Sequence, residues 1–195
     1  MQRAVSIRLQ LLILLGGCDG FPDRSSDFAC DVDADCDAGR RCDRRYCVVG
    51  PPVDCADPLP CAGTIIAVVC GDACWTSCTE ELTGTAAYDR CQAWDARLAP
   101  LRTADDAACF TMVRPPGADV WTGLVQDVAA TQPNARWSWN GDSRPLDFTA
   151  WNELDIEPDD RDLQEDGDEQ CALSNPDELW SDQACTEEHA FTCRR

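Results

Sequence analysis

Cysteine content is the feature that most constrains what this chain can fold into. Fifteen cysteines occur among 195 residues, about 8% of the chain and close to the level that marks a disulfide scaffold. So many thiols would be at risk in a reducing cytosol, so we expect an oxidising compartment. Setting Cys18 aside leaves fourteen cysteines, an even number that seven disulfides can consume. The sequence therefore predicts a disulfide-rich chain without free thiols.

Charge excludes one large class of function. The formal net charge is −20, and every basic residue is Arg. Nucleic-acid recognition needs clustered positive charge, so we exclude a nucleic-acid partner. The only histidine, His189, lies beside the last expected strand and leaves few arrangements for general-base catalysis. Composition therefore gives no support to an enzyme.

The N-terminus predicts export and a lipid anchor. Residues 1–17 carry two Arg before an apolar run at 9–15 that is too short to span a bilayer. The tetrad Leu15-Gly16-Gly17-Cys18 resembles the lipobox of bacterial lipoproteins, in which the signal peptide is cleaved before an acylated cysteine. This resemblance implies that Cys18 carries a lipid such as palmitate. It also implies a location in the bacterial cell envelope, at the outer membrane or the cell surface.

Two short segments precede the main unit. Residues 18–27 are polar and are expected to form a tether. Residues 28–50 contain four cysteines and are too short to build a core, so disulfides would be their main support. Their acidic run at 31–37 is similar in spacing to a calcium loop of the EF-hand type, but Cys36 and Cys42 stand where that loop needs Gly and Glu. Residues 51–69 are expected to form a Pro-rich linker and a strand over 65–69.

Helical patterns and an acidic segment follow this strand. Ala87, Cys91 and Trp94 share one helical face. Thr103, with Asp106 three residues later, is typical of a capping box that opens a second helix. The stretch 153–169 contains ten carboxylates and one Arg, and such a run is usually solvated. Because Trp151 and Cys171 bracket it, we expect a loop held at both ends.

Nine short motifs between residues 70 and 195 fall in the order of a known family. They are residues 87–91, 97–101, 120–124 (Val-Trp-Thr-Gly-Leu), 137–139 (Trp-Ser-Trp), 151–152, 157–159 (Glu-Pro-Asp), 169–172, 179–182 and 191–193. Together they resemble the C-type lectin-like domain. The resemblance implies an α+β fold with two helices, antiparallel sheets and a long calcium-binding loop over residues 70–195.

The same resemblance implies two disulfides. Cys91 is expected to pair with Cys193, and Cys171 with Cys185. Six further cysteines exceed the needs of the family, and the sequence alone leaves their pairing open. They are Cys55, Cys61, Cys70, Cys74, Cys78 and Cys109.

The resemblance also implies a calcium site. Its side-chain ligands would be Glu157, Asp159, Glu169 and Asp182, and carboxylates are ligands that Ca²⁺ prefers. Ser181 joins this set as a sugar contact. Asp159 and Ser181 stand where the family usually has Asn, so an amide that could donate to a sugar hydroxyl is missing.

Five other carboxylates are alternative ligands, because the acidic loop is longer than in many members: Asp160, Asp162, Glu165, Asp166 and Asp168. The family's second calcium site is incomplete, with Gln126 and Ala130 near the positions of its acidic ligands.

Three functions compete at this point. The first is a calcium-dependent, non-enzymatic module that binds carbohydrate or cell-surface glycan from a lipid anchor. The second is a lectin-like domain that binds a protein, with calcium structural or absent. The third is a glycosidase with Glu157 as acid and Asp159 as base. No nucleophile motif supports the third, and a bound metal would suppress the raised pKa that an acid requires.

Overall fold

The computed structural model describes residues 40–43, 46–49, 54–140, 145–160 and 169–195. The chain forms two compact units, Met1–Gly50 and Pro51–Arg195. In the first unit, strands β1 (Arg40–Asp43) and β2 (Tyr46–Val49) pair antiparallel. The predictions for residues 1–17, for Cys18, for the tether 18–27 and for cysteine pairing within 28–50 lie outside the described residues. Within the described part, no helix combines the length and apolarity that crossing a bilayer requires.

The second unit contains two helices and eight strands among its described residues. In chain order they are β3 (Ile65–Cys70), β4 (Ala73–Thr83), α1 (Gly84–Ala93), β5 (Arg97–Leu98), α2 (Ala104–Val113), β6 (Val120–Gln126), β7 (Trp137–Trp139), β8 (Cys171–Ser174), β9 (Trp180–Gln183) and β10 (Glu188–Arg194). The α+β class and the two helices predicted from the sequence are confirmed.

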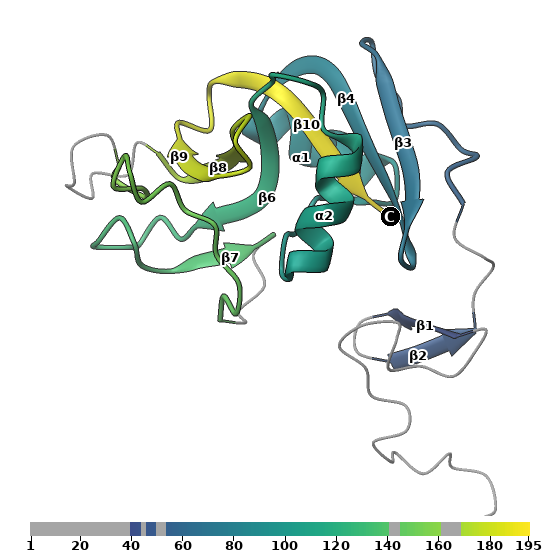
Figure 1. Cartoon of the computed structure of the whole chain (residues 1–195), viewed down its shortest axis with the longest axis horizontal. Coiled ribbons are helices and arrows are strands. Elements are labelled where there is room, and N and C mark those ends of the chain that lie inside the picture. The colour runs from purple at the N-terminus through teal and green to yellow at the C-terminus, as the bar shows by residue number, and fades with distance from the viewer. Residues whose placement is uncertain (1–39, 44–45, 50–53, 141–144, 161–168) are drawn as a thin grey trace, which may run out of the picture. The chain divides into compact units, whose positions relative to one another are not determined.

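All eight strands belong to one mixed sheet (Figure 1). Its main order is β3-β4-β10-β6-β8-β9, while β5 pairs with β10 and β7 with β6. The pairing of β10 with β6 is parallel, and the other pairings are antiparallel. The last strand therefore lies between the first hairpin and the strands that lead to the acidic loop.

The two helices cover opposite faces of this sheet. Neighbouring residues of a strand point to opposite faces, so the residues of β4 show which face each helix covers. On β4, Trp75 belongs to one buried cluster and Cys74 to the other. Phe110 of α2 lies in the cluster of Trp75, whereas Cys91 of α1 lies in the cluster of Cys74. In Figure 1, α2 stands in front of the strands and α1 behind them.

Both helices begin at a threonine cap. Thr83 accepts a hydrogen bond from the Ala86 N–H at 3.2 Å, and Thr103 accepts one from the Asp106 N–H at 3.1 Å. Such bonds satisfy donors that a helix start leaves without partners. The Asp106 carboxylate in turn accepts the Arg102 N–H at 3.0 Å, so the side chain three residues into the segment bonds back to the start of the helix, as expected of a capping box.

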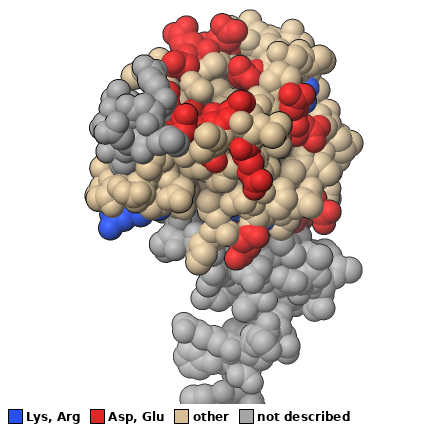
Figure 2. Space-filling view, turned by 60° about the vertical axis from the view of Figure 1, so that its left-hand side comes forward, with Lys and Arg blue, Asp and Glu red and all other residues tan. Residues whose placement is uncertain are grey.

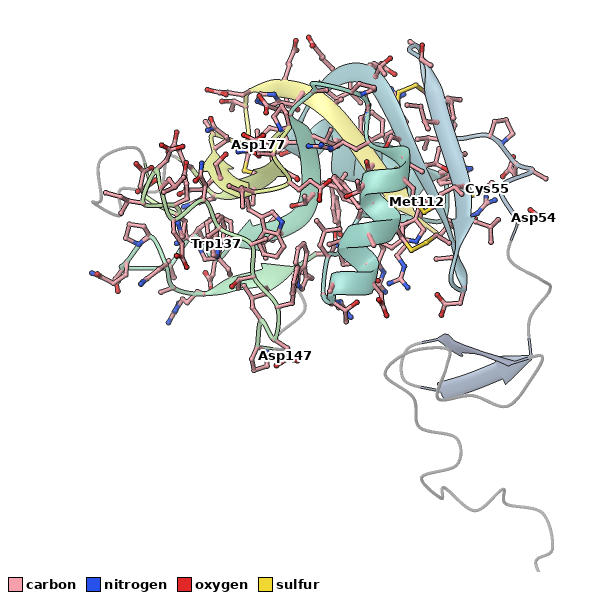
Figure 3. The ribbon with its side chains drawn as sticks, in the orientation of Figure 1. Asp54, Cys55, Met112, Trp137, Asp147 and Asp177 are labelled. Atoms are coloured by element: carbon pink, nitrogen blue, oxygen red, sulfur yellow. A yellow bond between two sulfur atoms is a disulfide. The ribbon has the colours of Figure 1, made fainter. Side chains whose placement is uncertain are left out.

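Five disulfides hold the second unit together, and Figure 3 draws disulfides as yellow bonds. Cys91–Cys193 joins α1 to β10, and Cys171–Cys185 joins β8 to the turn before β10; these are the two pairs that the family resemblance implied. The six cysteines left open form Cys55–Cys74, Cys61–Cys78 and Cys70–Cys109. All three bind the β3–β4 hairpin to the segment before it or to α2.

Gly123 allows three strands to meet at the centre of the sheet. A Cβ atom at this position would lie 2.4 Å from the carbonyl oxygen of Leu98 and 2.6 Å from the side-chain amide of Asn140. The backbone at Gly123 instead donates to Ala99 at 2.9 Å and accepts from Asn140. Only a residue without a side chain permits this approach.

Candidate functional site

A layer of aromatic rings supports the loop that carries the candidate ligands. The ring of Trp180 on β9 has edge contacts with Trp139, Phe148 and Trp151, at centroid distances of 5.4, 5.7 and 5.7 Å. Trp151 also meets Trp137, which is labelled in Figure 3, at 5.0 Å. Apart from Trp151, which is half-buried, these tryptophans are buried. They form core rather than an open platform for a ligand.

Asn152 fixes the turn between this layer and the acidic residues. Its N–H donates to the Trp180 carbonyl at 2.9 Å, and its own carbonyl accepts the N–H groups of Asp155 and Glu157, each at 3.1 Å. Its side-chain amide donates to the Asp155 carboxylate at 2.5 Å. Ile156, the last residue before Glu157, has a left-handed backbone with a φ of 71°. This conformation ends the turn and places Glu157 in the site.

Three carboxylates come together after this turn. Glu157, Asp159 and Asp182 each offer an oxygen such that all three oxygens lie within 4.8 Å of one another. We call these residues the carboxylate cluster. Glu157 and Asp159 come from the loop, and Asp182 comes from β9. The peptide bond between Glu157 and Pro158 is cis. The structure therefore brings together three of the four ligands predicted from the family resemblance.

Asp182 also fastens the loop to the sheet. It is 1% exposed, and its two carboxylate oxygens accept the N–H groups of Asp159 at 3.0 Å and Asp160 at 2.9 Å. Hydrogen bonds to an ionised carboxylate are stronger than those between neutral groups. Asp182 thus positions the backbone of the loop and faces the other two carboxylates of the cluster.

Glu157 and Asp182 bring two carboxyl groups together without an Arg partner among the described residues. Burial, followed by a hydrogen bond and repulsion from Asp182 and by repulsion from Asp159, raises the pKa of Glu157 to about 9. Its Oε2 is buried and has no hydrogen-bond partner among the described residues. Within the described part of the chain, no Arg forms an ion pair with Glu157 or Asp182. A proton or a cation between Glu157 and Asp182 would relieve their repulsion.

The neighbouring surface is also acidic. Figure 2 turns the side of the molecule that carries β8 and β9 towards the viewer, and its Asp and Glu side chains greatly outnumber its Arg side chains. Such a surface favours cations over anions as ligands.

The remaining predicted site residues take different places. Glu169 is buried, and its N–H donates to the Asp160 carboxylate at 3.0 Å, but its carboxylate is not a member of the cluster. Asp160 is 1% exposed and bridges Glu169 and Asp182 through backbone hydrogen bonds. Ser181 is buried on β9 and pairs in register with Leu173. The alternative ligands Asp162, Glu165, Asp166 and Asp168 lie outside the described residues.

Gln126 has a structural role where the family's second calcium site would lie. Its side-chain amide donates to the carbonyls of Gln132, Pro133 and Ala135, at 3.1, 3.0 and 3.1 Å. These bonds hold the loop after β6. The sequence had indicated only that an acidic ligand is missing here.

A second group of potential ligands, formed by Cys61, Cys78 and Glu80, is not a metal site. The two cysteines are joined as a disulfide. The Glu80 carboxylate forms an ion pair with Arg90 at 2.8 Å and accepts a hydrogen bond from the N–H of Ala62 at 2.8 Å. The hydrogen bond from Arg90, then that from Ala62, lowers the pKa of Glu80. This group therefore closes the segment before β3 rather than holding an ion.

Carboxylate oxygens, one of them buried without a partner, fit a hard cation such as Ca²⁺. Glu157, Asp159 and Asp182 could hold it, and burial, followed by the hydrogen bond and repulsion from Asp182, is what raises the pKa of Glu157. The donor set does not fit soft transition metals, which prefer thiolate or imidazole ligands.

Comparison with known proteins places this geometry in a family. Residues 80–195 match the family model of the lectin C-type domain. No curated protein sequence matches the chain. Many solved structures do, and the matches below are 20–22% identical, so they show the fold alone.

Three solved structures illustrate the fold. The cow C-type carbohydrate-recognition domain of CD23, solved with a GlcNAc2Man3 oligosaccharide, is 22% identical, with a TM-score of 0.55 over 67% of this chain and 92% of that one. A Ca²⁺-dependent type II antifreeze protein is 21% identical, with a TM-score of 0.55 over 66% and 96%. A calcium-independent type II antifreeze protein is 20% identical, with a TM-score of 0.55 over 69% and 97%. These matches confirm the α+β, disulfide-rich C-type lectin-like fold.

Proposed function

Because this chain belongs to the family of C-type lectin domains, we propose that it is a calcium-dependent carbohydrate-binding module, displayed at a bacterial membrane by a lipid on Cys18. The carboxylate cluster of Glu157, Asp159 and Asp182 is the observation that carries this proposal. It gathers three hard oxygen ligands, two on a loop that Asp182 and Asn152 hold in place and the third from Asp182 itself on β9. A module of this kind binds its ligand without chemical change.

Each residue of the site would have a separate role in binding. Glu157, Asp159 and Asp182 would hold the cation, and Glu169, two residues before β8, would join them. Calcium bound there supplies open coordination positions for two neighbouring sugar hydroxyls. The ligand carboxylates would then accept hydrogen bonds from the same hydroxyls. Asp159 is an acceptor only, so the hydroxyl of Ser181 is the remaining side-chain donor for the sugar in this set.

A second candidate function is recognition of a protein, with calcium structural or absent. Leu154 is 91% exposed and Ile156 is 63% exposed, in the turn immediately before Glu157. Exposed large apolar side chains beside a binding site favour a protein partner. The absence of the family's two Asn side chains at positions 159 and 181 points in the same direction. One of the similar structures is, by its description, calcium-independent.

A glycan array probed with the chain in calcium and in chelator tests the first function. We expect binding to a subset of glycans in calcium and none in chelator. Glu157→Gln should abolish this binding, whereas Glu153→Gln, an exposed site four residues earlier on the same loop, should retain it. Calcium uptake without binding to any glycan would contradict the carbohydrate proposal and favour the protein ligand.

The lipid anchor is tested separately. The native chain should partition into the detergent phase, and Cys18→Ser should move it to the aqueous phase. Mass spectrometry should find a mature N-terminus at Cys18 with acyl chains attached. Any other mature N-terminus would contradict the anchor without affecting the binding module.

A further inference from the structure

Asp160 is buried in the acidic stretch 153–169, where the sequence predicts solvated side chains. It is 1% exposed, whereas Glu153 and Asp155 on the same stretch are exposed. A carboxylate that leaves water loses hydration energy, and hydrogen bonds inside the protein must offset that loss. The burial of Asp160 therefore indicates a specific role, and its bonds identify that role.

Asp160 links β9 to the residues that precede β8. Its N–H donates to a carboxylate oxygen of Asp182 on β9, at 2.9 Å. Its own Oδ1 accepts the N–H of Glu169, at 3.0 Å. This second bond joins the chain before residue 161 to the chain after residue 168. Glu169, two residues before β8, is thus held by its backbone to a residue that is itself held by β9.

The residue type at position 160 suits both bonds. The backbone there is left-handed, with a φ of 47°. Asp and Asn adopt this conformation more readily than other residues that carry a side chain. Their short side chains also accept hydrogen bonds from nearby backbone N–H groups. Asp adds a negative charge, which strengthens such a bond.

The backbone around Glu169 is also fixed on its other side. The carbonyl of Gln170 accepts the N–H of Gln126 on β6 at 3.0 Å, and Cys171 pairs in register with Val125. The side chain of Glu169 is 5% exposed. A group that is already held in place loses little further freedom when it binds a ligand. Glu169 is therefore prepared to contribute a ligand from a fixed backbone.

The carboxylate of Asp160 is engaged in this support. Asp159, its neighbour in the chain, belongs to the carboxylate cluster, but Asp160 does not. We propose that Asp160 is a positioning residue, which holds the backbone of Glu169 so that Glu169 acts as the fourth ligand of the cation. This inference rests on the calcium site of the proposed function. Groups that orient metal ligands commonly raise metal affinity by about 10–100-fold.

Calcium affinities of single variants, measured by calorimetry, distinguish a positioning residue from a ligand. Asp160→Ala removes the acceptor of the Glu169 N–H and should weaken calcium binding about 10–100-fold. Asp160→Asn keeps an acceptor oxygen without the charge, and should weaken it by no more than about fivefold. A larger loss in Asp160→Asn would overturn the proposal, because it would identify Asp160 as a ligand. The matched control, Asp147→Ala, is an exposed site before Trp151 (Figure 3) and should bind as the wild type does.

A double-mutant cycle tests whether Asp160 acts through Glu169. Glu169→Gln should weaken calcium binding without abolishing it, since the three carboxylates of the cluster remain. In that background Asp160→Ala should cost less than about threefold more, because the ligand carboxylate that Asp160 positions is already gone. Equal losses in the two backgrounds would overturn the proposal, because Asp160 would then act on another part of the site.

Amide hydrogen exchange in chelator examines the same bond without calcium. The Glu169 N–H should be protected in the wild type and in Asp160→Asn, and its protection should fall at least about tenfold in Asp160→Ala. Unchanged protection in Asp160→Ala would overturn the proposal. A wild-type chain that takes up no calcium would overturn the proposed function and this role together. A wild-type chain that binds calcium no more tightly than Asp160→Ala would overturn this role alone.

Discussion

Glu157→Gln should have opposite effects on stability with and without calcium. A carboxyl group whose pKa is higher in the folded than in the unfolded protein destabilises the fold as the pH rises above its unfolded value. For Glu157 the pKa rises from 4.5 to about 9, so the penalty begins near pH 4.5 and grows until about pH 9. Gln cannot ionise, and its amide can still donate to Asp182. The substitution should therefore stabilise the calcium-free protein at neutral pH.

The size of this effect follows from the linkage relation. At pH 7 the full penalty would be about 3 kcal/mol, since pH 7 lies about 2.5 units above the unfolded pKa. Glu157 is only partly buried, and solvent screening reduces such electrostatic energies, so we expect a gain of about 1–2 kcal/mol. At pH 4 the carboxyl is mostly protonated in both states, and the gain should nearly vanish. In saturating calcium the variant should instead lose the stabilisation that calcium gives the wild type.

Urea unfolding in chelator, with the disulfides intact, measures these changes as shifts in the midpoint at constant slope. Glu153→Gln serves as the matched control, because this residue is exposed on the same loop, and it should leave the midpoint unchanged at both pH values. A Glu157→Gln chain that is less stable than wild type in chelator at pH 7 would refute the reasoning. An equal gain at pH 4 and pH 7 would refute it as well, because it would not arise from ionisation.

Three further predictions concern the loop, the sheet and the disulfides. In the Glu157→Gln background, where the repulsion between the two carboxylates is already removed, Asp182→Asn should destabilise the calcium-free protein by about 1–3 kcal/mol in urea unfolding, because one of the two buried N–H groups that Asp182 binds would face an amide donor; an unchanged midpoint in that background would show that Asp182 does not fasten the loop. Gly123→Ala should cost about 1–3 kcal/mol, since its Cβ would lie 2.4 Å from the Leu98 carbonyl, and an unaltered thermal midpoint would contradict that close approach. The mature, lipid-modified chain should show no free thiol in a titration under denaturing, non-reducing conditions, so one reactive thiol would contradict complete pairing.

The sequence was sufficient to predict much of the fold. Each recognised motif marks a place where backbone geometry or burial restricts the residue type. Gly123 permits the approach of Leu98, Thr103 begins a helix, and the apolar run at 65–69 forms β3. Such requirements are local, so they can be read without knowing which segments meet.

The parts that the sequence left open depend on contacts between distant segments. The pairing of Cys70 with Cys109 follows from α2 packing on the face of β3, and no spacing rule encodes it. The role of Asp182 as an acceptor for two loop N–H groups depends on how β9 meets the loop. The residue spacing of Glu157 and Glu169 likewise does not determine the distance between their carboxylates.

Calcium titration of the chain by calorimetry tests the central claim most directly. We expect saturable uptake at or below millimolar calcium, and a hundredfold excess over Kd should stabilise the fold by about 2.7 kcal/mol. Because the pKa of Glu157 is raised to about 9 without metal, uptake at pH 7 should release a proton, and the measured heat should change with the ionisation enthalpy of the buffer. Glu157→Gln should abolish uptake, and Glu153→Gln should retain it. A wild-type chain that takes up no calcium at millimolar concentration would contradict the proposed site.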